Sequence, residues 1–212
     1  MLPPLPTAMH RRAFLTRSTS PARPASHRHS ALVADLTPYA GPWTPTQAAH
    51  LVRRTHFGAS RQDVVSALVA GSAGAAASAL VNKAASRPLP DAPGWAGTIT
   101  SDNGLNTLRV YEWQRAWYTE MAAGGLREKL ALLWHDHFAT GHEVYRHAAF
   151  AVEYLTFLRE HAVGPFRPLL QGIGTRPAML RFLDNEQNEA GNLNENYARE
   201  ILELFSMGLT AP

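Results

Sequence analysis

Apolar residues recur every three or four positions along most of this chain, and this spacing constrains its fold more than any other feature. Between Asn106 and Ala123 the period aligns four large side chains on one face: Val110, Trp113, Trp117 and Met121. No segment shows the sustained alternation of β-branched and polar residues that is typical of strands. The sequence therefore predicts an all-α protein, an irregular multi-helix bundle.

Capping residues, glycines and prolines divide this pattern into separate helices. The predicted helical ranges are 47–54, 64–69 after a cap at Ser60, 75–83, 106–123, 126–140, 146–162, 166–173, 176–183 and 194–207. Residues 87–104 contain three prolines and three glycines, which predicts a long loop. A loop of this length indicates either a functional lid or joint, or a variable surface excursion.

The first 39 residues differ from the rest of the chain. They are rich in Arg, Pro and Ser and poor in large apolar residues, so we expect a disordered arm over 1–39 and a helical domain over 40–212. Within the arm, Arg11-Arg12-Ala13-Phe14-Leu15 resembles the core of a twin-arginine export signal. The apolar stretch that should follow such a signal is missing, so the motif leaves export, a plain disordered arm and a misassigned start codon as alternatives. The arm, rich in Ser and Arg and poor in acids, also resembles an organellar transit peptide.

Composition excludes several classes of function. The chain has no cysteine, which excludes disulfides, thiolate zinc sites and cysteine nucleophiles. Its net charge of +3 arises in the arm, because residues 1–34 hold five arginines and no acid while the remainder is net negative. We therefore expect no nucleic-acid-binding face. The sequence also lacks an apolar run long enough for a transmembrane segment, a nucleophile elbow, a phosphate-binding loop and a dinucleotide fingerprint.

A polar loop beginning at Asp184 has the ligand spacing of a calcium-binding loop. Oxygen-bearing side chains occupy relative positions 1, 3, 5, 9 and 12, namely Asp184, Glu186, Asn188, Asn192 and Glu195. The sixth position, where such loops carry glycine, is Glu189 instead. The spacing predicts a calcium site formed by these five residues.

The same loop also fits a purely structural role. Asn194 is a favourable N-cap for the last helix, and Arg199 lies four residues from both Glu195 and Glu203. In this interpretation the loop and the helix form a rigid bracket with no ligand.

A second group of candidate residues surrounds His135-Asp136-His137. His135 and His137 point about 200° apart on a helix, so they cannot bind one ion together. Glu128 lies seven residues before His135 and shares its face, which suggests a metal-dependent hydrolase using these two residues. An acid–base pair of His135 with Asp136 is an alternative, and we predict that His137 is a core histidine bonded to a backbone carbonyl.

Five blocks of the sequence, in this order, resemble the bacterial domain of unknown function 1800 family. They are residues 50–60, 128–140, 159–167, 177–185 and 194–205, and the resemblance extends over about residues 45–208. The block that begins Asn194-Glu195-Asn196-Tyr197-Ala198 is the most recognisable.

The resemblance implies an all-helical, often exported bacterial protein of no established activity. It also implies a partner, a sulfatase-like protein of the domain of unknown function 1501 family, encoded nearby. Members of the family usually continue well beyond the length of this chain, so the sequence is expected to correspond to the N-terminal part of a member. Three functions remain open: an uncharacterised helical protein with a structural or calcium-binding loop at 184–195, a metal-dependent hydrolase, and a non-functional fragment of a longer gene.

Overall fold

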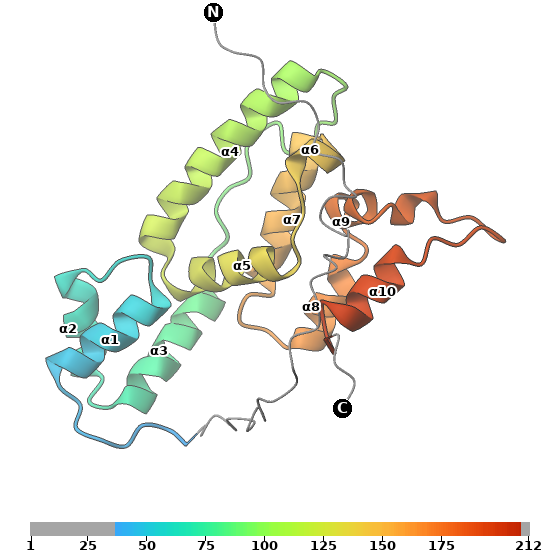
Figure 1. The fold of residues 1–212 in the computed structure, drawn as a ribbon. Coiled ribbons are helices and arrows are strands. Elements are labelled where there is room, and N and C mark those ends of the chain that lie inside the picture. Colours follow the sequence, from blue (N-terminus) through green and yellow to red (C-terminus); the bar gives the residue numbers. More distant parts are fainter. Residues whose placement is uncertain (1–36, 209–212) are drawn as a thin grey trace, which may run out of the picture. The chain divides into compact units, whose positions relative to one another are not determined.

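The computed structural model describes residues 37–208, which form ten α-helices, one 3-10 helix and no strand (Figure 1). The helices are α1 (Pro45–Thr55), α2 (Arg61–Val69), α3 (Ala73–Ser86), α4 (Asn103–Gly124), α5 (Leu126–His137), α6 (His142–Tyr145), α7 (Ala148–Glu160), α8 (Phe166–Ile173), α9 (Pro177–Phe182), η2 (Asn185–Gln187) and α10 (Asn196–Glu203). The predicted all-α class is confirmed. Most of the expected disordered arm, residues 1–36, lies outside the described residues, and so do its paired arginines.

Three of the described helices, α2, α3 and α4, begin at a residue whose side chain caps them. Oγ of Ser60 accepts a hydrogen bond from the backbone N–H of Asp63 at 3.1 Å, so the predicted cap of α2 is confirmed. Ser72 and Asp102 cap α3 and α4 in the same way, at 3.2 and 3.0 Å. These caps satisfy backbone donors that have no partner within the first turn of a helix.

Of the predicted ranges only 166–173 matches an observed helix at both ends, and two of the differences show what ends or divides a helix here. The helix expected over 146–162 begins at Ala148, because Arg146 adopts a left-handed conformation with φ 61° and separates α6 from α7. The last helix, expected over 194–207, covers only Asn196–Glu203. Its N-cap position is Glu195, and Oδ1 of Asn194 accepts a hydrogen bond from the N–H of Asn196 at 3.0 Å.

Three apolar clusters hold the described helices together. The first joins α1, α2 and α3 around four small or β-branched residues, Ala48, Val52, Ala67 and Ala76. The largest lies among α5 to α10 and includes Phe138, Leu158, Leu169, Ile173 and Met179, all fully buried. The third joins α4, α5 and α7 around Trp113, Ala131, Val152 and Leu155.

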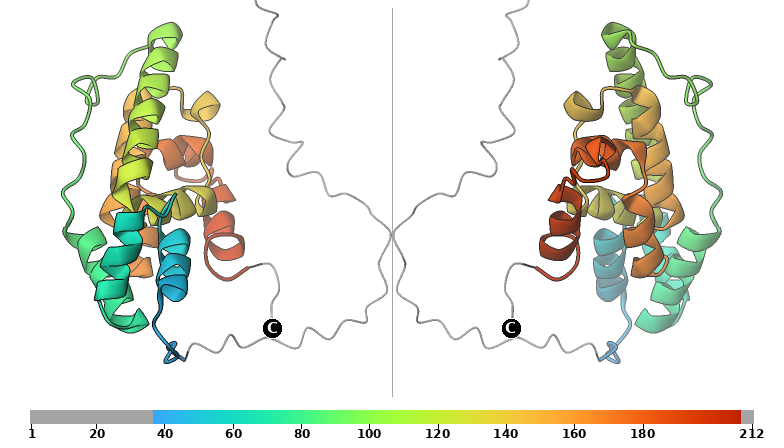
Figure 2. Two further views of the ribbon diagram at one scale, coloured as in Figure 1. Left: turned by 90° about the vertical axis from the view of Figure 1, so that its left-hand side faces the viewer. Right: turned by 90° about the vertical axis from the view of Figure 1, so that its right-hand side faces the viewer.

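Helix α5 is central to this arrangement, since it contacts α3, α4 and α7 (Figures 1 and 2). Its buried face differs from the stripe that the apolar spacing of its residues predicts, namely Leu126, Leu130, Leu133, Trp134, His137 and Phe138. Leu133 is 52% exposed, whereas Arg127 and Glu128 are buried together with Ala131. The apolar pattern was misleading here because α5 is covered on two sides, and the face between α4 and α7 contains charged residues.

No single helix among residues 37–208 has the length and apolarity to span a membrane. Helices α2 and α3 reach the length and apolar composition of a membrane span only when they are taken together, and the chain bends by 118° between them.

Candidate functional site

Charged residues occupy core positions on two facing helices. On α5 and the residue after it, Glu128, Ala131, His135 and Phe138 follow one another at intervals of three, four and three. The same intervals relate Val152, Leu155, Arg159 and Ala162 along α7. Residues at these intervals share one face of a helix. Glu128 and Arg159 therefore meet in the contact between α5 and α7.

The meeting point is an ion pair buried from solvent. Nε of Arg159 donates to Oε2 and Oε1 of Glu128 at 2.9 and 3.1 Å. Nε1 of Trp117 on α4 donates to Oε2 of the same carboxylate at 3.0 Å. Nε of Arg127 lies 3.6 Å from Oε1. Glu128 thus joins three helical segments, and both of its oxygens are engaged.

The turn between α4 and α5 provides the space for this carboxylate. A Cβ atom at Gly124 would overlap the side chain of Glu128, including a 3.2 Å approach to its Cβ atom. Gly125 has φ +60°, in a region that other residues rarely adopt. The Gly124-Gly125 pair is therefore required both by the turn and by the buried acid that follows it.

The long loop after α3 is fixed to the helices that carry this cluster. Nη1 and Nη2 of Arg127 donate to the carbonyl oxygens of Arg87 and Pro88, the latter at 2.8 Å. Arg87 in turn forms an ion pair with Glu120 of α4 at 2.9 Å. Further along the loop, Nε1 of Trp95 donates to Oε2 of Glu112 at 3.0 Å. The predicted loop is thus held against α4 and α5 at several points.

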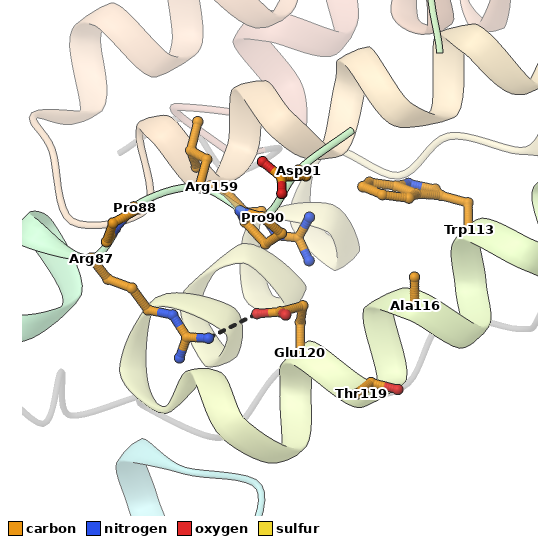
Figure 3. A pocket seen from close by; sticks show the side chains of 10 residues that line it. Arg87, Pro88, Pro90, Asp91, Trp113, Ala116, Thr119, Glu120 and Arg159 are labelled. Carbon is orange, nitrogen blue, oxygen red and sulfur yellow. Dashed lines mark hydrogen bonds and ion pairs between the residues drawn. The ribbon is translucent and has the colours of Figure 1, made fainter. Parts of the chain in front are cut away.

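A pocket of about 690 Å³ lies between this loop and α4, with Arg159 of α7 in its wall (Figure 3). Its lining residues are Arg87, Pro88, Leu89, Pro90, Asp91, Trp113, Ala116, Thr119, Glu120 and Arg159. In Figure 3 the guanidinium of Arg159 points into the pocket rather than away from it. Its volume is typical of small-molecule sites, about 300–1,000 Å³.

Three buried nitrogen atoms of the pocket residues have no hydrogen-bond partner within residues 37–208. They are Nη1 and Nη2 of Arg159 and Nε1 of Trp113. The two side chains are in contact, with Cζ of Arg159 5.4 Å from the centre of a Trp113 ring. All three atoms are donors, and a buried donor without a partner costs about 1–3 kcal/mol. Three donors of the pocket residues therefore have no acceptor within residues 37–208.

The catalytic candidates are only partly brought together. Glu128 and His135 both contact Trp117, His135 through ring centroids 5.7 Å apart, which agrees with the face they were predicted to share. Asp136 is exposed, and no hydrogen bond joins it to His135 in the described part of the chain. Burial lowers the pKa of His135, and the negative charge of Asp136 only partly opposes this effect. The ring of His135 contacts the rings of Trp117 and Tyr154, in both cases with centroids 5.7 Å apart.

His137 was predicted to be a core histidine bonded to a carbonyl. Its Nε2 atom lies 3.0 Å from the carbonyl oxygen of Phe205, so the hydrogen bond is present. The residue itself is exposed, so the prediction of a core position is wrong. The reason is the rotated buried face of α5, which leaves the Leu133 side toward solvent.

Several side chains of the candidate calcium loop are engaged with one another or with the preceding helix α9. Oε2 of Glu186 accepts from Nε of Arg181 at 3.0 Å. Asn188 bonds to Asn185 through its amide nitrogen and to the backbone N–H of Asn194 through its amide oxygen. Asp184 is in a left-handed conformation with φ 54°. These contacts agree with a bracket that is stabilised from within.

Glu195 occupies the N-cap position of α10, and Asn192 forms an isolated bridge with Glu189. The expected ion pairs of Arg199 with Glu195 and Glu203 are absent from the described residues, where Arg199 instead lies 3.8 Å from Glu200. No group of three or more His, Asp or Glu residues within 37–208 could hold a metal ion. Amide and backbone oxygens can also bind calcium, so the calcium site stays a prediction.

Sequence reasoning missed the residues that form the pocket, above all Arg159, Trp113 and Asp91. A signal for Arg159 was present, because it interrupts an apolar stripe formed by Val152, Leu155 and Ala162. A charge at a core position needs a buried partner. No comparable signal marks Asp91, which the loop brings to the pocket.

The fold and the pocket define a class: a helical protein in which a buried arginine forms part of the wall of a small-molecule-sized cavity. A family model described as "Protein of unknown function (DUF1800)" matches residues 50–211, and the chain belongs to this family. No curated protein and no solved structure matches the chain.

Proposed function

We propose that this chain is a non-catalytic ligand-binding module that holds an anionic group of a small molecule on Arg159. The proposal rests on three donor nitrogens of Arg159 and Trp113. They line the same pocket and have no hydrogen-bond partner among the described residues. An oxyanion supplies the acceptors that these donors lack. Arginine binds carboxylates and phosphates through two parallel hydrogen bonds, which makes it well suited to this role.

The charge of the buried cluster supports the same proposal. Arg127 and Arg159 are two cations, and Glu128 is the only acid paired with either of them in the described part of the chain. Burial lowers the pKa of Arg127, as expected for a cation that is poorly solvated. A bound anion would neutralise the excess positive charge of this cluster.

Binding is favoured over the alternative of a metal-dependent hydrolase. A metal ligand or a general base needs an accessible oxygen atom, but both oxygens of Glu128 accept hydrogen bonds from Arg159 and one also from Trp117. His135 faces aromatic rings rather than the pocket. These contacts give Glu128 a positioning role for Arg159.

The test is a titration of the purified protein with sodium acetate and with inorganic phosphate at constant ionic strength. Binding would be followed through the indole N–H signal of Trp113 in ¹H–¹⁵N spectra, assigned with Trp113→Phe. We expect this signal to shift on addition of an anion. Trp113→Phe keeps an aromatic ring but removes one donor. Because this variant lacks the indole signal, its affinity would be measured by calorimetry, and it should bind about three- to tenfold more weakly, the equivalent of one hydrogen bond.

Two further variants make the test specific. Arg159→Lys keeps the charge but loses the planar pair of donors, so it should bind at least about tenfold more weakly. Arg167→Lys, on the exposed surface of α8, is the matched control and should bind as the wild type does. If neither anion shifts the Trp113 signal, or if Arg159→Lys binds both as tightly as the wild type, the proposal is wrong.

The expected export and the sulfatase-like partner stay predictions that the family resemblance implies. We propose them as the location and the partner of the binding module, and not as its activity. Co-expression with the neighbouring sulfatase-like protein, followed by size-exclusion chromatography, would test the partner: co-elution is the expected result.

A further inference from the structure

We infer that the ligand of this pocket is amphoteric, with a carboxylate for Arg159 and a cationic group for Asp91, separated by an aliphatic spacer. This inference rests on the proposed function and adds the chemical class of the ligand. Its basis is the distribution of charge around the pocket of Figure 3, where acids as well as arginines are present.

The first pole of the pocket is positive and deficient in acceptors. Arg159 is 2% exposed, its Nε atom is used by Glu128, and its Nη1 and Nη2 atoms have no partner among residues 37–208. Nε1 of Trp113, in the same wall, is another donor without a hydrogen-bond partner among these residues. A planar carboxylate can accept from both Nη atoms at once.

The second pole is negative. Glu120 is already neutralised by Arg87 at 2.9 Å. Asp91 is exposed and forms no ion pair within the described residues. Once a ligand carboxylate has bound to Arg159, the carboxylate of Asp91 is the remaining uncompensated charge of the lining. An ammonium group on the ligand would neutralise it.

The charge balance favours this ligand over a multiply charged anion. The ionisable lining residues are Arg87, Arg159, Asp91 and Glu120, so the lining is neutral overall. The buried residues behind it, Arg127 and Glu128, also form a neutral pair. A phosphate dianion would add two negative charges near Asp91 and Glu120, whereas a zwitterion adds none. Like charges brought together in a pocket weaken binding, which is a common basis of specificity.

Part of the pocket lining is apolar. Pro88, Leu89 and Pro90 from the loop face the same cavity as Ala116 from α4. Methylene groups gain free energy when they are removed from water against such a surface. A chain of methylene groups between the carboxylate and the ammonium group therefore matches the lining.

The experiment compares two series of compounds of equal chain length. The ω-amino acids are glycine, β-alanine, 4-aminobutyrate and 6-aminohexanoate, and the matched alkanoates are acetate, propionate, butyrate and hexanoate. Affinities for the purified full chain would be measured by calorimetry and by the Trp113 indole signal. At one optimal length we expect the amino acid to bind at least about tenfold more tightly than its alkanoate, and more tightly than inorganic phosphate.

Asp91→Asn tests the second pole without disturbing the buried cluster. It should reduce the preference for the amino acid over the alkanoate to less than about threefold. Glu189→Gln, which removes an exposed acid from the 184–195 loop, is the matched control and should leave the preference unchanged.

The outcomes separate this inference from the proposed function. If alkanoates and amino acids bind equally at every length, or phosphate binds most tightly, the pocket binds anions but the ligand is not amphoteric. If Asp91→Asn tightens alkanoate binding and leaves the preference for amino acids unchanged, Asp91 is an internal competitor for Arg159, and the inference is again wrong. If no compound of either series binds and phosphate does not bind, both proposals fail.

Discussion

Glu128 on α5 and Arg159 on α7 form an ion pair whose side chains are 0% and 1% exposed, respectively. Such a pair stabilises the fold weakly in total, because removing both charges from water costs about as much as their attraction returns. The pair has a stronger effect on how α5 and α7 pack. If α7 shifted along its axis, Arg159 would move away and Glu128 would be buried without its partner. The pair thus fixes the register of two helices and orients the free nitrogens of Arg159.

Breaking this pair from either side should destabilise the protein. Glu128→Met leaves two buried arginines without a carboxylate, and Arg159→Met leaves the carboxylate with Arg127 alone, so each should cost about 3–5 kcal/mol of unfolding free energy. The double variant should cost less than the sum, because Glu128 and Arg159 are then both absent and only Arg127 is left without its carboxylate. Urea unfolding of the three variants measures these values.

The half-exposed pair of Arg181 with Glu186 serves as the control. Arg181→Met should cost no more than about 1 kcal/mol, as is usual for pairs near the surface. Equal losses in Arg181→Met and Arg159→Met would show that Glu128 and Arg159 gain nothing from burial and would contradict the prediction.

Two helical glycines should respond in opposite ways to alanine. In Gly74→Ala the new methyl group meets no atom within 4 Å, so the helix propensity of alanine should raise the unfolding free energy by about 0.5–1 kcal/mol. In Gly124→Ala the methyl group would overlap the side chain of Glu128 and push it from Arg159. We expect this variant to be destabilised by about 1–3 kcal/mol. The denaturation midpoints of the two variants, measured under the same conditions, should shift in opposite directions. A stabilised Gly124→Ala would mean that Glu128 can move at little cost in free energy.

Much of this fold could be predicted from local sequence signals. Ser60 with Asp63 marked the start of α2, and Gly124-Gly125 marked the junction of α4 and α5. The break at Arg146 could not be predicted in this way, because arginine rarely adopts the left-handed conformation and its identity gives no signal for it.

The pocket was harder to predict than the helices. Arg159 and Glu128 were visible as charges on apolar faces, but their pairing depends on how α5 packs against α7, which periodicity does not specify. Asp91 reaches the pocket through a loop whose path is set by hydrogen bonds from Arg127 to backbone carbonyl groups. Backbone acceptors are present at every residue, so the sequence contains no signal for such a path.

The predicted calcium site at 184–195 has a direct test. Millimolar calcium should raise the melting temperature if the loop binds the ion, since a ligand that binds only the folded state stabilises it by about 2.7 kcal/mol at one hundred times its Kd. The rise should be absent in Asp184→Ala combined with Glu195→Ala, and magnesium at the same concentration is the ionic control. If calcium produces no shift beyond that of magnesium, the loop is a structural bracket and the calcium site is excluded.

The buried imidazole of His135 should make the stability of the protein fall in mild acid. Burial between Trp117 and Tyr154 lowers its pKa from the ordinary 6.5, so the unfolded chain takes up a proton at a higher pH than the folded protein does. Between the lowered pKa and 6.5 the unfolded state binds more protons, and stability therefore decreases as the pH falls through this window. Above about pH 7 the imidazole is neutral in both states, so it makes no contribution to the dependence of the unfolding free energy on pH.

The matched variant is His135→Phe, which keeps an aromatic ring between Trp117 and Tyr154 but cannot take up a proton. The unfolding free energies of the two proteins should differ by a constant amount above pH 7. As the pH falls toward 5, the unfolding free energy of the wild type should decrease relative to that of the variant. His142, whose pKa burial also lowers, is present in both proteins, so its contribution cancels in this difference. Urea unfolding at half-unit pH steps measures the difference, and parallel curves from pH 7.5 to 5 would show that His135 titrates alike in the folded and unfolded states.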